Sequence, residues 1–345
     1  MAVRVAVNGY GTIGKRVADA VAKQTDMTLV GVAKTRPSFE ARLAVQSGYP
    51  LYVAGEGEVA AFEKAHLPTA GRVEDLLRQV DVVIDAAPDK VGRENAKLYA
   101  QAGVRAVFQG GEKSDVAEVS FNALANYDAA KGKRTVRVVS CNTTGLVRAA
   151  AALTSKWEVE HWEATIVRRG ADPTETKKGP INGILPTFQL PSHHGHDVNT
   201  VFPQLHISTT AVVVPTTLMH VHVNHVRFAR GPTDTAELLD TFRRTPRFHV
   251  FEPWEGVDGT PHVLEYARDR GLGRQDMMEN ALWEHGTRLD GRDATFFQAI
   301  HQESIVIPEN IDAVRAMFGL APDAAHSIAQ TDRSLGIPPP AGAPA

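Results

Sequence analysis

Short runs of β-branched and other apolar residues alternate with stretches of helical periodicity over the first 140 residues. The apolar runs are Arg4–Val7, Thr28–Ala33, Val80–Ala86, Val104–Phe108 and Val136–Val139. Strands that alternate with helices in this way are typical of βαβ units, whose strands pair in parallel. The pattern therefore predicts an α/β fold built on a doubly wound parallel sheet.

A glycine-rich turn joins the first two of these runs. It reads Gly9-Tyr10-Gly11-Thr12-Ile13-Gly14, and the apolar residues at positions 17, 18 and 21 share one helical face after it. Between a strand and a helix, the first two glycines permit a tight turn and close backbone approach to a pyrophosphate, and the third lets the helix pack on the sheet. We therefore expect a Rossmann-type domain in which Gly9, Gly11, Thr12, Ile13 and Gly14 bind a dinucleotide. An ordinary glycine-rich turn is the alternative.

The residues after the second run indicate which dinucleotide is bound. An NAD site usually carries Asp or Glu about 20 residues after the motif, where it binds the ribose hydroxyls. Here the run is Lys34-Thr35-Arg36-Pro37-Ser38, and no acid occurs before Glu40. Cations and hydroxyls suit a 2′-phosphate, so we expect Lys34 and Thr35 to favour NADP, with NAD tolerated. The alternative is a solvated turn whose cations face water.

Two later strand ends also suit a ligand. The segments Asp85-Ala86-Ala87-Pro88 and Phe108-Gln109-Gly110-Gly111 each close an apolar run with small residues or proline. Open α/β sheets bind their ligands at the carboxyl ends of the strands. Gly111 is therefore a further candidate for contact with the cofactor.

Composition and charge exclude several classes of function. The 345 residues are 43% hydrophobic and 22% charged, which is ordinary for a globular protein of one or two domains. Lys plus Arg total 37 against 40 Asp plus Glu, so the charge balance predicts no nucleic-acid partner. No apolar stretch approaches the ~18 residues of a membrane span, and the N-terminus lacks the pattern of a secretory leader. We expect a cytoplasmic protein that acts on small molecules and does not bind membranes.

The chain has a single cysteine, which excludes an internal disulfide and a metal cage of several thiolates. Cys141 follows the fifth apolar run, in Ser140-Cys141-Asn142-Thr143-Thr144-Gly145, ahead of an alanine-rich helix. The unpaired N–H groups at a helix start stabilise a thiolate, so Cys141 there can be more acidic and more nucleophilic than a free thiol. The alternative is a small buried residue at a turn.

Further blocks occur in order along nearly the whole chain: Asn8–Arg16, Lys34–Pro37, Ser140–Leu146, Arg168–Pro173, Pro191–Gly195, Pro215–His220, His301–Glu303 and Pro308–Ile311. Together they resemble the archaeal-type phosphorylating glyceraldehyde-3-phosphate dehydrogenases. One departure is His196, where proline is expected after the His-His-Gly step. The resemblance implies reversible oxidation of D-glyceraldehyde 3-phosphate to 1,3-bisphosphoglycerate with inorganic phosphate, a step of glycolysis and gluconeogenesis. It also suggests a homotetramer.

The resemblance implies that Cys141 is the nucleophile. It would form a thiohemiacetal with the aldehyde and, after hydride transfer to the nicotinamide, a thioester. The backbone amides of Cys141 and Asn142, or the Asn142 side chain, could stabilise the oxyanion, with Ser140 beside them at the substrate. His220 matches the general base, which is a role that suits histidine near neutral pH.

His220 and His222 alternate with valines, which places both histidines on one face of a strand. A zinc site is an alternative, formed by His220, His222 and His225 with His193, His194 and His196. None of these spacings matches a known closed zinc site, so we expect no metal. We expect His222 and His225 to be ordinary strand or loop residues.

Two consecutive arginines end a probable strand, so Arg168 and Arg169 point to opposite sides. The resemblance places Arg169 beside the cofactor and Gln302 at the nicotinamide, and it leaves Arg168 to a phosphate or to structure. His193, His194 and Gly195 match the family's substrate-binding loop, for which a solvated loop is the alternative.

We expect three segments: a dinucleotide-binding domain at 1–139, an α+β catalytic domain with a mixed or antiparallel sheet at 140–302, and 303–345. The last segment should return as a helix to the first domain and end in a loose Pro-rich tail from Gly336. Thr233–Phe242, Arg274–Trp283 and Pro308–Met317 have helical patterns.

Two other functions remain open. One is another acyl-thioester dehydrogenase, such as an aspartate-semialdehyde or N-acetylglutamyl-phosphate reductase. The second is a nucleotide-sensing or interaction protein with an unreactive Cys141.

Overall fold

The computed structural model describes residues 2–88, 90–109, 111–172, 175 and 179–342. The chain divides into two compact units, Met1–Ser140 with Val306–Leu335, and Cys141–Ile305 with Gly336–Ala345. None of the helices in the described part of the chain combines the length and the apolarity that crossing a bilayer requires. We describe each unit by itself.

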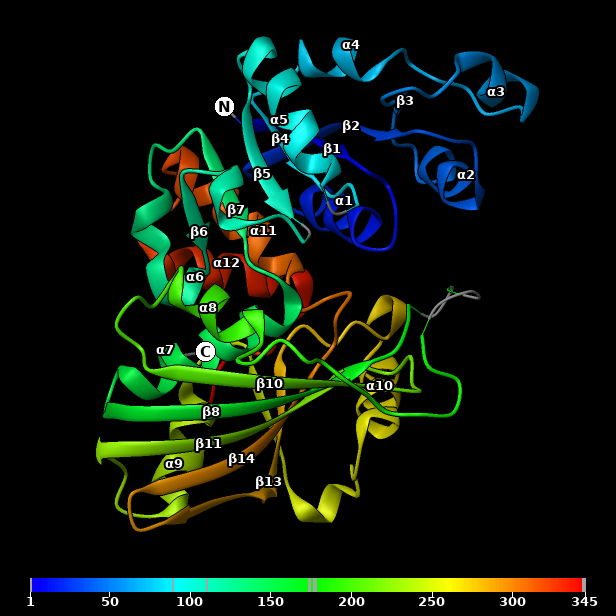
Figure 1. Cartoon of the computed structure of the whole chain (residues 1–345). Coiled ribbons are helices and arrows are strands. Elements are labelled where there is room, and N and C mark those ends of the chain that lie inside the picture. Colours follow the sequence, from blue (N-terminus) through cyan, green and yellow to red (C-terminus); the bar gives the residue numbers. More distant parts are fainter. Residues whose placement is uncertain (1, 89, 110, 173–174, 176–178, 343–345) are drawn as a thin grey trace. The chain divides into compact units, whose positions relative to one another are not determined.

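The first unit holds a sheet of seven parallel strands (Figure 1). They are β1 (Val3–Asn8), β2 (Met27–Lys34), β3 (Leu51–Val53), β4 (Val82–Asp85), β5 (Arg105–Gln109), β6 (Val119–Phe121) and β7 (Thr135–Val138). The order is β3-β2-β1-β4-β5-β7-β6, so the direction of winding reverses between β1 and β4. The doubly wound sheet is confirmed, and such a reversal point is where open α/β sheets bind ligands. The two shortest strands, β3 and β6, were not predicted.

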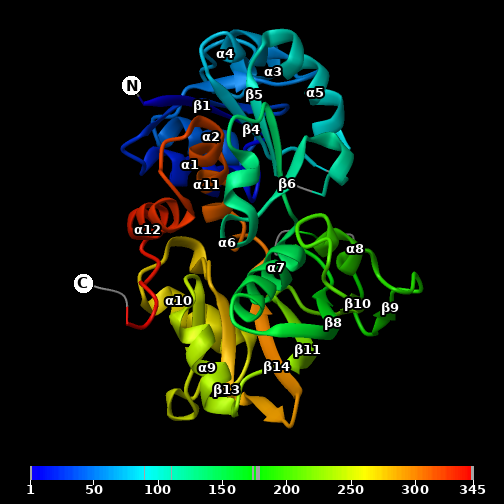
Figure 2. The same cartoon turned by 90° about the vertical axis from the view of Figure 1, so that its left-hand side faces the viewer.

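Helices cover this sheet on both faces. As a result, β4 is buried along its whole length and β1 and β5 along nearly all of theirs. The helices are α1 (Gly14–Ala22), α2 (Phe39–Gln46), α3 (Val59–Lys64), α4 (Val73–Leu77), α5 (Val91–Ala102), α6 (Ala123–Asn126), α11 (Ile307–Phe318) and α12 (Ala324–Leu335). Helices α1 and α11 contact each other, as do α4 and α5 (Figure 2). Val17, Ala18 and Val21 of α1 are buried, which confirms the predicted apolar face.

Helix α11 is fastened to the first unit by buried polar side chains. The Oε2 atom of Glu309 accepts a hydrogen bond from Ala123 N at 2.8 Å, and Asn310 Nδ2 donates to Gln109 Oε1 at 2.9 Å. The fully buried Arg315 makes an ion pair with Asp26 at 2.7 Å. Buried charges are tolerated when they are paired in this way. The hydrogen bonds of Glu309 and Asn310 show that the Pro-Glu-Asn block attaches the returning chain to its N-terminal unit.

The second unit holds a mixed sheet, as predicted (Figure 1). Its strands are β8 (Glu158–Arg169), β9 (Leu185–Pro186), β10 (Ile207–Val214), β11 (His220–Arg230), β12 (Phe248–Phe251), β13 (Asn280–Asp290) and β14 (Asp293–Ile300). The order is β12-β13-β14-β11-β8-β10-β9. Strand pairs β8·β10 and β12·β13 are parallel and the others are antiparallel.

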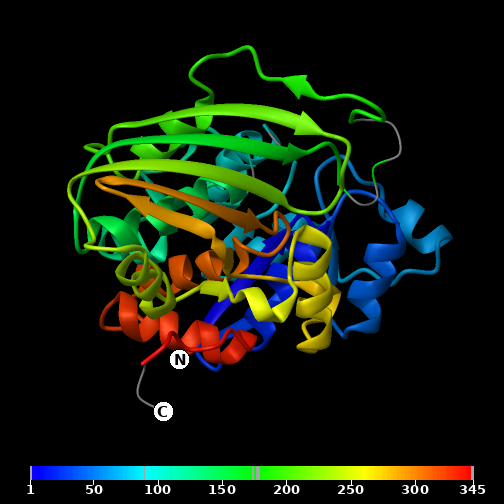
Figure 3. The ribbon, with the colours of Figure 1, turned by 90° about the horizontal axis from the view of Figure 1, so that it is seen from below.

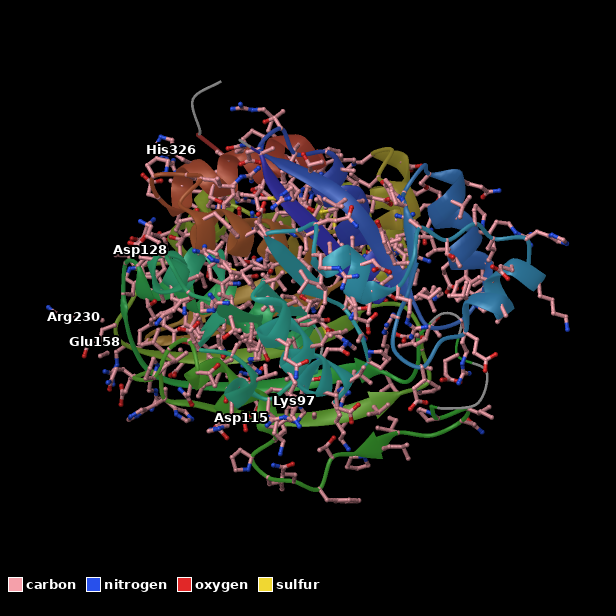
Figure 4. The ribbon with its side chains drawn as sticks, turned by 90° about the horizontal axis from the view of Figure 1, so that it is seen from above. Lys97, Asp115, Asp128, Glu158, Arg230 and His326 are labelled. Carbon is pink, nitrogen blue, oxygen red and sulfur yellow. The ribbon has the colours of Figure 1, made fainter. Side chains whose placement is uncertain are left out.

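Helices of this unit cover one face of the mixed sheet (Figure 3). Helix α7 (Cys141–Thr154) contacts β8 and β14, and α9 (Thr235–Arg244) contacts β12 and β13, whereas α8 (His193–Asn199) contacts β10. Along β8, Trp162 and Ile166 are buried while Glu163 is exposed, which is the alternation of a sheet with one open face. Exposed Glu158, the first residue of β8, pairs with exposed Arg230, the last residue of β11 (Figure 4). Arg230 Nη2 lies 3.9 Å from Glu158 Oε2.

The helix expected over Arg274–Trp283 is wrong. Residues Gly273–Gln275 form a short 3₁₀ turn, and β13 begins at Asn280. Strand β13 pairs with β12 on one side and β14 on the other, and residues 280–283 are all buried. A strand that is buried on both faces loses the polar alternation that would distinguish it from a helix, so periodicity misled the prediction.

The end of the chain differs from the loose tail expected from its composition. Ile337 is buried, Gly336 O accepts a hydrogen bond from Arg270, and Ala341 N donates to Arg243 O at 2.8 Å. One buried apolar side chain, one hydrogen bond from the Arg270 guanidinium and one backbone–backbone hydrogen bond therefore connect 336–341 to the second unit.

Candidate active site

The glycine-rich turn lies at the carboxyl ends of β1 and β4, where the sheet reverses its order. Gly9 has φ +101°, and a Cβ there would lie 2.7 Å from the backbone of Ala86. A Cβ at Gly14 would collide with the carbonyl oxygen of Gly9. At Gly11 it would meet no atom of the described residues within 4 Å. The fold thus explains two of the three glycines, and the third suits close approach of a ligand to the backbone.

A buried hydrogen-bond network, which the sequence did not reveal, supports the strand ends below this turn. Asn8 Nδ2 donates to Tyr99 Oη at 2.7 Å, and Tyr99 Oη donates to Asp85. Asn95 Nδ2 donates to the same carboxylate at 2.8 Å. Burial raises the pKa of Asp85, while the hydrogen bonds from Tyr99 and Asn95 oppose the shift. The network fixes the ends of β1 and β4 relative to each other.

The lysine expected to select the cofactor is held in place from two sides. Lys34 Nζ donates to Tyr10 O at 3.2 Å and lies 3.5 Å from Glu40 Oε2. Ser38, the N-cap of α2, donates to the same carboxylate at 2.6 Å. Burial alone would raise the pKa of Glu40, but the Ser38 hydrogen bond and the charge of Lys34 bring it below its ordinary value. An acid is therefore near Lys34 after all, because α2 folds it back.

The other predicted cofactor residues of this unit are more open. Thr35 and Arg36 are exposed, and Thr12 and Ile13 lie half-buried in the turn. Gly111 is exposed after the end of β5, and Gly110 lies outside the described residues.

Cys141 is the first residue of α7, so the predicted place at a helix start is confirmed. The acidity of its thiol differs from the expectation. Burial raises the pKa of Cys141 to about 11, although the Asn142 backbone N–H and the charges of Arg169 and Arg168 lower it. Loss of hydration outweighs the helix terminus, so the thiol of this structure is protonated near neutral pH.

His220, the first residue of β11, is buried. Its Nδ1 atom accepts a hydrogen bond from Arg169 N at 3.0 Å. Burial and the charge of Arg169 hold the pKa of His220 well below its usual value, so the ring is neutral. A neutral imidazole that accepts at Nδ1 carries its proton on Nε2. His220 therefore presents a hydrogen-bond donor at Nε2.

Arg169 and Gln302 lie together, because the Arg169 guanidinium donates to Gln302 Oε1. The same guanidinium makes ion pairs with Glu303 and Asp172, neither of which was predicted as a site residue. Burial alone would raise the pKa of Glu303, but His301 and Arg169 lower it to about 2. Glu303 is thus a buried carboxylate that fixes Arg169.

The segment around His193 is not a solvated loop throughout. His193 and His194 stack at 4.0 Å at the start of α8, and Gly195 N donates to Thr209 Oγ1 at 2.9 Å. His194 is buried, and burial lowers its pKa to about 3, while His193 is exposed. After burial, the charge of Arg168 is the next cause that lowers the pKa of His193.

Arg168 is the other arginine of the pair, and its Nε atom is buried without a hydrogen-bond partner in the described part of the chain. A buried guanidinium nitrogen of this kind suits an anionic ligand. His196, the departure from the family pattern, is exposed in the last turn of α8.

The remaining histidines of β11 behave differently from each other. His225 is exposed and contacts Thr295, whereas His222 is fully buried and lies 2.9 Å from Asn142 Oδ1. Both histidines lie in β11, as the sequence pattern predicted, but the contact between His222 and Asn142 was not predicted. Among the described residues, no group of three or more His, Cys, Asp or Glu side chains is placed to hold a metal ion.

Comparisons with known proteins agree with both units. Residues 140–294 match the model of the glyceraldehyde 3-phosphate dehydrogenase C-terminal domain, and residues 3–127 match that of the dihydrodipicolinate reductase N-terminus. The solved structure of aspartate semialdehyde dehydrogenase II from Vibrio cholerae covers 92% of this chain and 97% of its own, with a TM-score of 0.66. At 14% sequence identity, this likeness shows a shared fold alone.

Whole-chain relatives are much closer. The chain is 53% identical to glyceraldehyde-3-phosphate dehydrogenase of Halobacterium salinarum, over 97% of this chain and 100% of the relative. Identity to the enzyme of Archaeoglobus fulgidus is 53%, over 98% of both chains, and to that of Thermococcus kodakarensis 50%, over 98% and 99%. The chain therefore belongs to the glyceraldehyde-3-phosphate dehydrogenase family, whose members are oxidoreductases that depend on a pyridine nucleotide.

Proposed function

We propose that this enzyme catalyses the phosphorylating oxidation of D-glyceraldehyde 3-phosphate to 1,3-bisphosphoglycerate, in the cytoplasm and within glycolysis or gluconeogenesis. The observation that carries the proposal is the position of Cys141 at the start of α7, beside the buried amide of Asn142. The catalytic residues we propose are Cys141, Asn142 and His220.

The reaction begins when the Cys141 thiol gives its proton to solvent water and the thiolate sulfur attacks the aldehyde carbon. A carbon–sulfur bond forms, and the carbonyl electron pair moves onto oxygen. The backbone N–H groups at the start of α7 and the Asn142 amide can donate to this oxyanion, with Ser140 next to them. A bound nicotinamide cofactor would supply the acceptor for the hydride that leaves the same carbon, and Cys141 would then hold the acyl group as a thioester. Phosphate oxygen then attacks the thioester carbon, and the thiolate departs.

The role of His220 follows from its hydrogen bond to the backbone. A general base at Nε2 needs a lone pair there, whereas acceptance from Arg169 N leaves the proton on Nε2. We therefore propose that His220, with its proton on Nε2, donates a hydrogen bond to the oxyanion or to the departing thiolate. Hydride transfer from an oxyanion needs no further proton removal, so a donor is sufficient for this step.

We propose that Arg168, His193, His194 and Gly195 bind the phosphate groups of the substrate and the attacking phosphate. The unpartnered, buried Nε of Arg168 supports this assignment, as does the stacked pair of histidines at the start of α8. Both histidines have lowered pKa values, so they act as neutral hydrogen-bonding groups.

We propose that Gly9, Gly11, Thr12, Ile13, Gly14 and Gly111 hold the dinucleotide in the first unit. For Arg169 and Gln302 we keep the role that the family resemblance implies, contact with the cofactor. Lys34 and Thr35 would bind the 2′-phosphate of NADP. Support for that preference comes from the hydrogen bond that holds Lys34 and from the exposure of Thr35.

The double variant Lys34→Ala, Thr35→Val should lower kcat/KM for NADP by roughly 10- to 100-fold, because two charge-assisted contacts to the phosphate are lost. The value for NAD should change by less than about threefold, since NAD lacks that phosphate. Initial rates with each cofactor measure both. Lys64→Ala, an exposed lysine at the end of α3, is the matched control. Equal losses for the two cofactors would show that these residues do not recognise the 2′-phosphate.

The proposed reaction is tested by the absorbance of reduced cofactor. Purified enzyme with D-glyceraldehyde 3-phosphate and NADP, and in parallel with NAD, should reduce the cofactor steadily only when inorganic phosphate or arsenate is present. Without either anion, the thioester has no acceptor but water. Equal steady rates without phosphate would make the enzyme a non-phosphorylating one, and no reduction at all would direct the search to other aldehydes.

We propose a homotetramer. Five apolar side chains between Ile181 and Leu190 support association, being 54–95% exposed in the single chain: Ile181, Ile184, Leu185, Phe188 and Leu190. A segment with several large apolar side chains exposed is typical of a surface that another subunit covers.

A further inference from the structure

A chain of buried hydrogen bonds ends at the side chain of Asn142. Asn280 Nδ2 donates to Gln298 Oε1 at 2.9 Å, Gln298 Nε2 lies 3.1 Å from His222 Nδ1, and His222 Nε2 lies 2.9 Å from Asn142 Oδ1. The four side chains are 0–4% exposed. Residues 142, 222 and 298 come from three different elements, α7, β11 and β14.

The hydrogen bonds of this chain have a single consistent direction. Because the oxygen of Gln298 already accepts from Asn280, its amino group must face His222 Nδ1. A neutral His222 that accepts at Nδ1 carries its proton on Nε2 and donates it to Asn142 Oδ1. Burial lowers the pKa of His222 to about 3, so the ring stays neutral over the working range of pH.

The direction of these hydrogen bonds determines which end of the Asn142 amide faces His222. Its oxygen is occupied by His222, so the amino group at the other end of the same planar amide is the end directed away from this chain. Asn142 follows Cys141 directly in the first turn of α7. If the amide were reversed, two donors would face each other at Nε2 of His222, at a cost of about 1–3 kcal/mol.

Close packing keeps the chain together. Gly145 lies one turn after Asn142 on α7, and a Cβ there would collide with Ile300 and lie 3.5 Å from His222 Cε1. Gly145 also offers its carbonyl oxygen to Asn280 Nδ2 at 2.8 Å. A glycine inside a helix is unfavourable by itself, so its presence here is explained by the close approach of α7 to these strands.

We propose that His222 and Gln298 are positioning residues, which hold the Asn142 amide with its amino group toward the oxygen of the substrate at Cys141. This inference rests on the proposed function. It assigns the buried polar residues a purpose beyond stability, because apolar side chains of similar volume would fill the same space without four donors and acceptors to satisfy.

The experiment compares His222→Met, which loses the donor, with His222→Gln, whose amide can donate to Asn142. His222→Met should lower kcat by roughly 10- to 100-fold with KM values changed by less than about threefold, because the oxyanion loses a well-placed donor. His222→Gln should recover a large part of this loss. His225→Gln, an exposed histidine on the same strand, should leave kcat unchanged. Gln298→Met provides a second route to the same effect if His222→Met does not fold.

The deciding measurement is a double-mutant cycle with Asn142→Ala. If His222 acts through Asn142, His222→Met should have almost no further effect on kcat in the Asn142→Ala background. A full additional loss there would overturn the proposal, as would equal kcat for His222→Met and wild type. An inactive wild type would instead refute the proposed function. In that case the positioning role is tested by comparing crystal structures of the wild type and His222→Met. An Asn142 side chain in the same orientation in both would overturn that role.

Discussion

We expect the Cys141→Ser variant to lose roughly 10⁴- to 10⁶-fold in turnover while it keeps the fold of the parent enzyme. The thiol is the only one in the chain, and a serine hydroxyl at the same place is a far weaker nucleophile near neutral pH. Serine also preserves the size of the side chain at the start of α7, so circular dichroism and the melting temperature should change little. Cofactor reduction in the phosphate-dependent assay measures the loss.

Alkylation of the thiol supplies the control and a pH test. Iodoacetamide should modify one residue of the wild type and none of the variant. Because burial raises the pKa of Cys141 to about 11, the thiolate fraction increases with pH up to that value. The alkylation rate should therefore rise roughly tenfold per pH unit from pH 7 to 10. A rate that levels off below pH 8 would show that the helix start and the two arginines outweigh burial. A native protein that neither labels nor turns over would be a nucleotide-binding protein without this chemistry.

The first sheet was predictable because its strands are buried on both faces and separated by helices. Val80–Ala86 and Val104–Phe108 stand out as apolar runs for that reason, and β4 and β5 lie within a few residues of them. The same property defeated the prediction at Arg274–Trp283, where neither a turn signal nor polar alternation marks a strand. Burial on both faces makes a strand stand out in the sequence as an apolar run, but the run alone does not distinguish a strand from a buried helix.

Candidate site residues were predictable where a local motif carries them, as in the glycine-rich turn and around Cys141. They were missed where a contact joins distant segments. Glu40 returns to Lys34 only because Ser38 caps α2, and Glu303 meets Arg169 across 134 residues. His222 meets Asn142 across 80 residues. Side-chain hydrogen bonds of this kind depend on the register of the sheet, which no local pattern specifies.

The acidity of the thiol marks another limit of local reasoning. A cysteine at a helix start is a favourable place for a thiolate, and the Asn142 N–H does lower the pKa of Cys141. Desolvation acts in the opposite direction and depends on everything packed around the residue. The sign of the net shift was therefore outside the reach of a motif.

Removal of the His220 ring should have the second largest effect. His220→Ala is expected to lower kcat by roughly 10²- to 10⁴-fold, whether the ring acts as a base or as a donor. That variant also leaves Arg169 N without its acceptor, which destabilises the end of β8 by about 1–3 kcal/mol. Two further variants separate the chemistry from this structural effect.

His220→Asn places an oxygen where Nδ1 accepts from Arg169 N but has nothing at the position of Nε2. His220→Gln can place an amide N–H near Nε2 and gives up the Nδ1 contact. If Nε2 is a donor, His220→Gln should retain at least about tenfold more activity than His220→Asn, even though His220→Asn is the more stable. If Nε2 is a base, both should be equally inactive, because neither amide can accept a proton. Higher activity for His220→Asn would mean that His220 serves chiefly to hold Arg169, and kcat with melting temperatures for the three variants decides among these outcomes.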